Sequence, residues 1–283
     1  MAVNPRLVAV SEMTKSAGLI TWWRLSGSVS LETLANRWQG DQKLLPNPVS
    51  DSVALHRAMR HYEARDVFLD KMPRMTGYAV VHVRHSKPGP LGVPQDPVYE
   101  TRLKVWIDKQ EQLQCTDLSE LKPLYARYQE CAQRLEAVEL STWLIKMADH
   151  YKSVRLRDGG GIYFVPETHV DAWRHVAQLI EHASQSTIYE VPAVRSEKAV
   201  EAILAAVVSE ATSQVESISK MLGDSDESPL GRRALISRQK ACSDILSKVA
   251  HYESLLGTRL TDLRGMIKAL EGRLVEALLV QDA

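Results

Sequence analysis

The last third of the chain carries a long series of apolar residues at helical spacing, and this pattern constrains the fold more than any other. From Cys242 to Leu278, apolar residues recur every three or four positions. Such spacing places them on one stripe of a helix. The stripe consists of Cys242, Ile245, Val249, Tyr252, Leu256, Leu260, Leu263, Ile267, Leu270, Leu274 and Leu278. The pattern predicts one helix over residues 232–279 with coiled-coil-like packing.

A shorter amphipathic helix is predicted over residues 196–222. Ser196 suits the N-cap, Glu197 places a carboxylate in the first turn, and Gly223 suits the C-cap. The breaker-rich segment 223–231 joins this helix to the next one. The sequence therefore predicts a long antiparallel helical hairpin over residues 193–283.

The two predicted helices differ in length, about 40 Å against about 70 Å at 1.5 Å per residue. The shorter helix therefore leaves part of the longer apolar stripe without a hairpin partner. Either another element of the same chain, a second copy or a different protein must cover it. The predicted partner or oligomer interface comprises Leu256, Leu260, Leu263, Ile267, Leu270, Leu274 and Leu278.

Composition limits the classes of function. The chain has 35 basic and 35 acidic residues, which argues against nucleic-acid or anionic-membrane binding over the whole surface but leaves a local patch open. No apolar run approaches the roughly 18 residues of a membrane span, and no signal peptide is predicted. Cys115, Cys131 and Cys242 are odd in number and widely spaced, as expected of buried thiols in a reducing compartment. We expect a cytoplasmic protein.

The rest of the chain mixes helices and short strands. The expected elements are helices over 51–69, 119–151 and 167–183, and strands over 78–84, 98–107, 154–157, 162–165 and 187–191. In the strand 98–107, Val98, Glu100, Arg102 and Lys104 alternate with Tyr99, Thr101, Leu103 and Val105, which predicts one wet face.

The predicted fold class is α+β and mainly helical. An N-terminal α+β region with antiparallel strands covers residues 1–115. A helix–β-hairpin–helix region resembling a winged helix covers 116–192, and the helical hairpin covers 193–283.

Two groups of residues are candidates for contact with nucleic acid. In the hairpin, Arg155 and Arg157 alternate with apolar residues and so share a face, with Tyr163 near them. Arginines on such a wing would contact phosphates in a salt-dependent way. Arg57, Arg60 and Arg65 form the second group, on the helix 51–69, within a segment (54–104) of nine basic and five acidic residues. A purely structural hairpin and an ordinary solvated helix face are the alternatives.

No motif for catalysis, metal binding or a cofactor stands out. Gly159, Gly160 and Gly161 lack the lysine and the following helix of a phosphate loop, and a strand follows instead. There is no Cys-x-x-Cys, His-Glu-x-x-His or Gly-x-Ser-x-Gly. The sequence predicts no catalytic residue, metal or cofactor, although an active site can assemble in space without a motif.

Three short motifs carry a resemblance. They are Thr21-Trp22-Trp23-Arg24, then Leu45-Pro46-x-Pro48 leading into Arg57-Ala58, and Gly160-Gly161-Ile-Tyr-Phe-Val-Pro166. Together they resemble an uncharacterised family encoded by phages and other mobile elements. The resemblance implies association with a phage or plasmid but no activity.

These patterns favour a non-enzymatic assembly or adaptor protein. It would self-associate as a homo-oligomer, or dock another protein, through its C-terminal helices, without a membrane. A nucleic-acid-binding protein with a basic wing and helix is the second hypothesis. An enzyme whose site is not visible in the sequence is the third.

Overall fold

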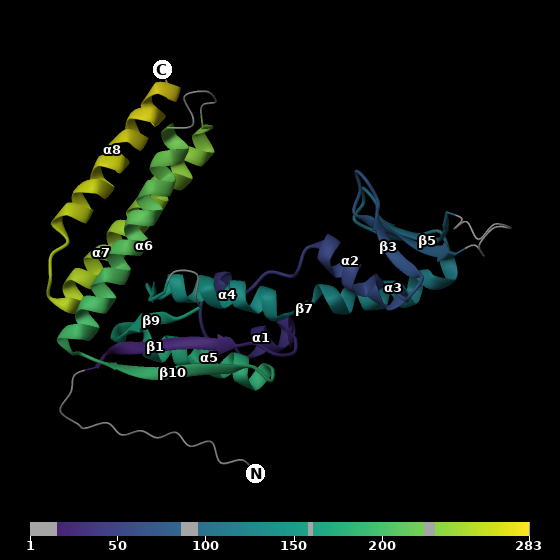
Figure 1. Ribbon diagram of the computed structural model, residues 1–283, viewed down its shortest axis with the longest axis horizontal. Helices are drawn as coiled ribbons and strands as arrows, with labels where there is room; N and C mark the ends of the chain where they lie inside the picture. The colour runs from purple at the N-terminus through teal and green to yellow at the C-terminus, as the bar shows by residue number, and fades with distance from the viewer. Residues whose placement is uncertain (1–15, 86–95, 158–160, 224–229, 283) are drawn as a thin grey trace, which may run out of the picture. The chain divides into compact units, whose positions relative to one another are not determined.

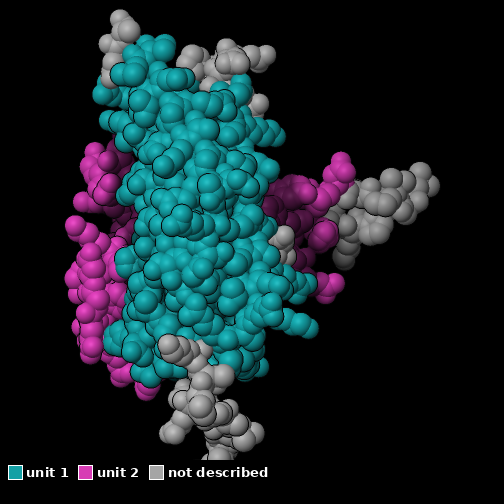
Figure 2. Space-filling model, turned by 90° about the vertical axis from the view of Figure 1, so that its left-hand side faces the viewer, with its two compact units in different colours: residues 1–24, 144–181, 186–283 teal, residues 25–143, 182–185 magenta. Residues whose placement is uncertain are grey.

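The computed structural model describes residues 16–85, 96–157, 161–223 and 230–282. The chain divides into two compact units, coloured separately in Figure 2. Unit 1 contains residues 1–24, 144–181 and 186–283, and unit 2 contains residues 25–143 and 182–185. This division differs from the three consecutive regions predicted (1–115, 116–192 and 193–283), because an N-terminal strand pairs with a strand beyond residue 186.

In unit 1, the described residues form an antiparallel sheet of four strands in the order β10-β1-β9-β8. The strands are β1 (Ser16–Arg24), β8 (Val154–Arg155), β9 (Tyr163–Pro166) and β10 (Thr187–Val194). The predicted pairing of β8 with β9 is confirmed, while turn residues 158–160 lie outside the described part. The hairpin is not a free wing, because β9 also pairs with β1.

The helices of unit 1 pack against this sheet and one another. They are the 3-10 helix η3 (Glu167–His169), α5 (Val170–Ala183), α6 (Glu197–Gly223), α7 (Arg232–Leu256) and α8 (Thr261–Asp282). Helices α6, α7 and α8 run side by side in Figure 1 and share one core. Ala17, Phe164 and Ala193 bring the sheet into the same core.

The prediction of one helix over residues 232–279 is wrong, because the chain turns back after Leu256. Gly257 has φ of 70°, in the left-handed region that favours glycine. The carboxylate of Glu253 holds the turn: it accepts from the backbone N–H of Leu260 at 2.7 Å and pairs with Arg264 at 2.8 Å. Helix α8 therefore folds back onto α6 and α7.

Unit 2 is built around a second antiparallel sheet, of order β3-β4-β5-β6 among the described residues. Its strands are β3 (Val67–Lys71), β4 (Gly77–Arg84), β5 (Val98–Ile107) and β6 (Leu113–Cys115). Helices α2 (Asp51–Met59) and α3 (Leu118–Ala132) pack on one face of it, with Leu55, Met59 and Leu124 in the core. Tyr128 links the two helices by donating to Asp51 at 2.8 Å, and its pKa rises to about 12, first through burial and then through that hydrogen bond.

Shorter elements complete unit 2. They are β2 (Val29–Ser30), α1 (Leu31–Arg37), the 3-10 helices η1 (Gln42–Leu44) and η2 (Arg60–Tyr62), β7 (Arg134–Leu135) and the start of α4 (Ala137–His150). Helix α4 ends within unit 1. Cys115, Cys131 and Cys242 are free thiols, with Cys131 only half-buried.

Two further helix predictions are wrong in their extent. The helix 51–69 ends at Met59, because the residues from Val67 onward pair with β4 instead. The helix 119–151 is interrupted, because Arg134 and Leu135 pair with β2. The fold class is nevertheless confirmed: the protein is α+β, mainly helical, with antiparallel sheets. In the described part of the chain, no helix combines the length and apolar character that crossing a membrane requires.

Candidate functional site

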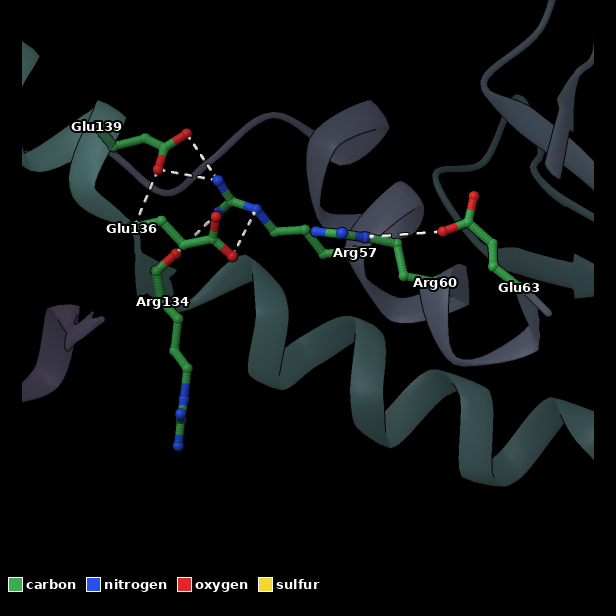
Figure 3. A network of polar contacts seen from close by, with 6 residues as sticks. All are labelled: Arg57, Arg60, Glu63, Arg134, Glu136 and Glu139. Carbon is green, nitrogen blue, oxygen red and sulfur yellow. Dashed lines mark hydrogen bonds and ion pairs between the residues drawn. The ribbon is translucent and has the colours of Figure 1, made fainter. Parts of the chain in front are cut away.

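Arg57, a predicted nucleic-acid contact, is held inside unit 2 by acidic partners (Figure 3). Its guanidinium donates to both carboxylate oxygens of Glu139 at 2.9 Å and lies 3.2 Å from Glu136. Burial is the largest single influence on Glu139 and opposes its ionisation. The hydrogen bond from Arg57, the backbone hydrogen bonds and the charge of Arg57 together outweigh burial and lower the pKa of that carboxyl. The side chain of Arg57 is only 14% exposed. Its charge therefore stabilises the fold and is not free for a phosphate.

The other two arginines of this predicted group do not share a helix with Arg57. Arg60 lies in η2 and pairs with Glu63 at 3.8 Å. Arg65 is exposed in the turn before β3. The three residues therefore form no continuous basic helix face, because the helix ends before the last two.

The predicted wing residues are brought together, but only its arginines reach solvent. Arg155 and Tyr163 are paired across β8 and β9, and the guanidinium donates to the Tyr163 hydroxyl at 3.2 Å. Tyr163 is 3% exposed and stacks on Trp23, with ring centroids 5.1 Å apart. A base cannot stack on a ring that is already covered. Arg155 and Arg157 are both exposed.

The predicted interface of the C-terminal helices is largely inside unit 1. Leu263, Ile267, Leu270 and Leu274 of α8 are at most 5% exposed. Leu256 is also buried, while Leu260 and Leu278 are partly buried against the same core. Of the alternatives for covering this stripe, the structure shows cover from the same chain, because α8 folds back onto α6 and α7. Leu263, Ile267, Leu270 and Leu274 are therefore not an exposed interface.

The outer face of the β3–β6 sheet, opposite α2 and α3, carries exposed aromatic rings. Phe68 of β3 and Tyr99 of β5 are 40% and 63% exposed. Their rings meet edge to face across β4, with centroids 6.3 Å apart. Val81 of β4, directly opposite Phe68, is only 7% exposed, as expected beneath such a pair. We call Phe68, Val81 and Tyr99 the aromatic platform.

A β-bulge brings Tyr99 to this face. Val80 pairs with Leu103 and Val81 pairs with Thr101, so Arg102 is the extra residue in β5. Strict alternation would place Tyr99 on the same face as Leu103, which is buried toward the helices. The bulge reverses the two faces of β5 on either side of Arg102, so the simple alternation predicted for this strand is wrong.

Exposed cations lie on the strands of this sheet and in the turns next to them. Of the basic residues in this region, Arg57, Arg60 and Arg84 are engaged in ion pairs. Among the described residues, no ion-pair partner lies within 4 Å of four exposed cations: Arg65, Lys71, Arg74 and Lys104. Lys104 lies on the outer face, because its partner in β4 is Ala79, which alternates with the buried Val80. The outer face thus combines the exposed rings with the unpaired Lys104, whereas Lys71 lies opposite Tyr78, which faces the helices.

Metal-ligating side chains do not cluster in the described residues. Within them, no group of three His, Cys, Asp or Glu side chains is placed to hold a metal ion. A small pocket between α6 and α7 contains Glu210 and Lys248, which pair with each other.

The model of a family of unknown function (DUF6744) matches residues 98–283 of this chain. No curated protein and no solved structure matches it. The matched segment includes β5, with Tyr99 and Lys104, and all of the C-terminal helices.

Proposed function

Because the chain belongs to this family of unknown function, we infer its role from its own surfaces. We propose that it is a cytoplasmic, non-enzymatic protein that binds single-stranded nucleic acid on the aromatic platform. The observation that carries the proposal is the exposed Phe68–Tyr99 pair on an open sheet face beside unpaired cations. Unstacked bases pack on exposed rings of this kind, each base contributing about 1–3 kcal/mol. Lysines and arginines at the edge attract the phosphate backbone.

The platform favours a single strand over a duplex. Bases in a duplex are stacked on one another and present only their edges. The exposed rings of the platform can stack only on the free face of a base, which a single strand offers. This proposal keeps the nucleic-acid hypothesis but moves it from Arg57, Arg155 and Tyr163 to Phe68, Tyr99 and Lys104.

The experiment is fluorescence anisotropy of labelled 15-nucleotide uridine and thymidine strands titrated with the purified chain. Tyr99→Ala is expected to weaken binding about tenfold through loss of one stacked base. Tyr125→Ala is the matched control, since Tyr125 is an exposed tyrosine (50%) on α3 of the same unit. Equal effects of the two substitutions, or tighter binding of a duplex of equal length, would reject the platform.

Lysine substitutions test the electrostatic part separately. Lys104→Ala is expected to weaken binding to both strands and to lower the salt slope by about 0.7 for one lost phosphate contact. Lys122→Ala on α3 is the control, because Lys122 is an equally charged, exposed lysine away from the outer face. An unchanged salt slope in Lys104→Ala contradicts a phosphate contact at this position.

Self-association is the second candidate function, now on a different surface from the one predicted. Helix α8 exposes several apolar side chains that lie outside the core, among them Met266, Val275 and Leu279, which are 45%, 38% and 63% exposed. Light scattering during size-exclusion chromatography, with absorbance at 260 and 280 nm, separates the two functions. An oligomer whose mass is a multiple of 31.7 kDa, and which Leu279→Asp converts to a monomer, supports assembly through α8.

The phage or plasmid association, which rests on resemblance alone, fits either function.

A further inference from the structure

Three segments of unit 1 bring a cluster of basic and hydroxyl side chains together at the surface. They are the end of α4 and the following turn, the 3-10 helix η3, and α7. The ring of His169 lies 5.7 Å from that of His251 and 5.8 Å from that of Tyr151, measured between centroids. Thr168 Oγ1 lies 3.5 Å from His251 Nε2. We call His169, His251, Lys152 and Thr168 the histidine cluster.

Lys152 occupies a backbone position that normally belongs to glycine. Its φ is 55°, in the left-handed region, directly after the end of α4. The backbone N–H of Ser153 donates to the carbonyl of Ala148, which is the hydrogen bond of a Schellman helix end. Glycine is the usual residue there because a side chain strains the backbone. Arg74 and Glu111 also adopt positive φ, so the role of Lys152 has to follow from the contacts of its side chain.

The fold also fixes Lys152 from two sides. The hydroxyl of the buried Tyr252 donates to the carbonyl of Lys152 at 2.8 Å, and the Lys152 ammonium donates to Ser247 Oγ at 3.1 Å. An ammonium group has three N–H donors, so one bond to Ser247 leaves two for another acceptor. Lys152 is thus positioned without being saturated.

In the described part of the chain, no ion pair or hydrogen bond joins a carboxylate to His169, His251 or Lys152. Burial lowers the pKa of both His169 and His251, and the positive charge of Lys152 lowers both pKa values further. Carboxylates on the same segments are occupied elsewhere: Glu167 accepts from Ser16 at 2.6 Å, and Asp149 has Lys248 and Arg155 as its cationic neighbours. Lys248 itself pairs with Glu210, and His150, an exposed neighbour, adds no negative charge.

We propose that His169, His251 and Lys152 form a binding site for a phosphate group, with Thr168 as a further hydrogen-bond donor. A phosphate offers several acceptor oxygens and at least one negative charge, which matches an ammonium and two imidazole N–H groups. The site lies outside the aromatic platform and does not rest on nucleic-acid binding, because free phosphate can fill it.

The test follows the histidine ring protons by NMR while pH is varied, first without and then with inorganic phosphate. A bound anion favours protonated imidazole, so the titration midpoints of His169 and His251 are expected to rise together and saturably. Sodium chloride of equal ionic strength is the control for screening. No rise in phosphate, or the same rise in chloride, overturns the proposal.

Lys152→Gly is the decisive variant, because glycine suits the left-handed position and the fold should survive. The apparent phosphate affinity is expected to fall about tenfold or more with the loss of a charge-assisted contact. Lys146→Ala is the control, because Lys146 is an exposed lysine of α4. Alanine replaces glycine in this control because Lys146 lies inside the helix. Unaltered affinity in Lys152→Gly rejects the site.

The double variant His169→Gln/His251→Gln gives an independent measurement by calorimetry with the same phosphate solutions. Loss of the heat of phosphate binding in the double variant, with that heat retained in His182→Gln, supports the site. Retained heat in the double variant contradicts it.

A nucleoside monophosphate is titrated in parallel. Tighter binding of the ester than of inorganic phosphate identifies the phosphate group of a larger molecule as the ligand, and equal binding identifies the free anion.

Discussion

The apolar stripe of α8 and the outer face of the β3–β6 sheet both carry apolar side chains, but the stripe is buried whereas the two aromatic rings of the sheet are exposed. Ile267 and Leu274 of α8 are fully buried, whereas Phe68 and Tyr99 stay 40% and 63% exposed. The two surfaces differ in what the chain does next to them. A turn at Gly257 folds the stripe onto α6 and α7, while the bulge at Arg102 turns Tyr99 toward solvent. Local backbone geometry therefore decides which apolar surface is core and which is available for binding.

The largest effect is expected from removing core contacts of α8. Ile267→Ala should lower the free energy of unfolding by about 2–5 kcal/mol, because a fully buried side chain leaves a cavity. Urea unfolding followed by circular dichroism measures the change. Met266→Ala, one residue away and 45% exposed, should change it by less than about 0.5 kcal/mol. Similar losses in both variants would mean that α8 does not pack as described.

The next largest effect is expected from a polar contact inside unit 2. Arg57→Ala removes the guanidinium from Glu139 and Glu136 and should cost about 1.5–3 kcal/mol, the range for hydrogen bonds to charged groups. Arg60→Ala is the control in the same segment, because its pairing with Glu63 at 3.8 Å is exposed. Urea unfolding compares the two, and an equal effect would show that the Arg57 contacts contribute little.

The same contact sets a pH dependence. The folded-state pKa of Glu139 lies below its ordinary value, so its contribution to stability is complete above about pH 4.3, the pKa of an unperturbed glutamate. That contribution is lost as the pH falls through the lowered folded-state pKa. Glu139→Gln should therefore destabilise the protein at pH 7 and converge on the wild type in strong acid. A constant difference at all pH values would contradict this linkage.

The turn that buries the stripe gives a smaller effect. Gly257→Ala places a side chain at φ of 70° and should cost about 1–2 kcal/mol. Gly265→Ala and Gly272→Ala are matched controls within α8, where an added Cβ meets open space. Both should stabilise the helix, by up to about 1 kcal/mol each. Opposite signs at Gly257 and the two helical glycines would confirm its special conformation, and a gain at Gly257 would refute it.

Periodic patterns in the sequence predicted the element types well but not the ends of the helices. The α6, α7 and α8 stripes were visible as three- and four-residue spacings, and the β8–β9 pairing followed from the glycines at 159–161. The break at 257–260 was missed because the apolar rhythm continues through it from Leu256 to Leu260. Gly257 was the available signal, but glycines at 265 and 272 lie inside the next helix, so glycine alone does not distinguish a turn.

Neither proposed binding surface could be derived from spacing. The bulge in β5 depends on its pairing with β4, a tertiary contact that alternation within one strand does not report. The histidine cluster joins residues about 100 positions apart, Lys152 and His251, which only the packing of α7 brings together.

The break between α3 and α4 had a local signal: the side chain of Glu139 accepts from the backbone N–H of Glu136 at 3.0 Å, half of a capping box.

The smallest effect on stability is expected on the aromatic platform, and it completes the contrast with the buried stripe. Phe68 and Tyr99 contact each other edge to face and are 40% and 63% exposed, so each alanine substitution should remove less packing than a substitution in the core. A double-mutant cycle in urea should give a coupling energy of about 0.5 kcal/mol, the lower end for aromatic pairs. Zero coupling would mean that the rings do not meet in solution. A loss as large as that of Ile267→Ala would make Tyr99 a core residue and remove the reason for expecting a base to stack on it, because a ring that stabilises the fold by burial has no free face.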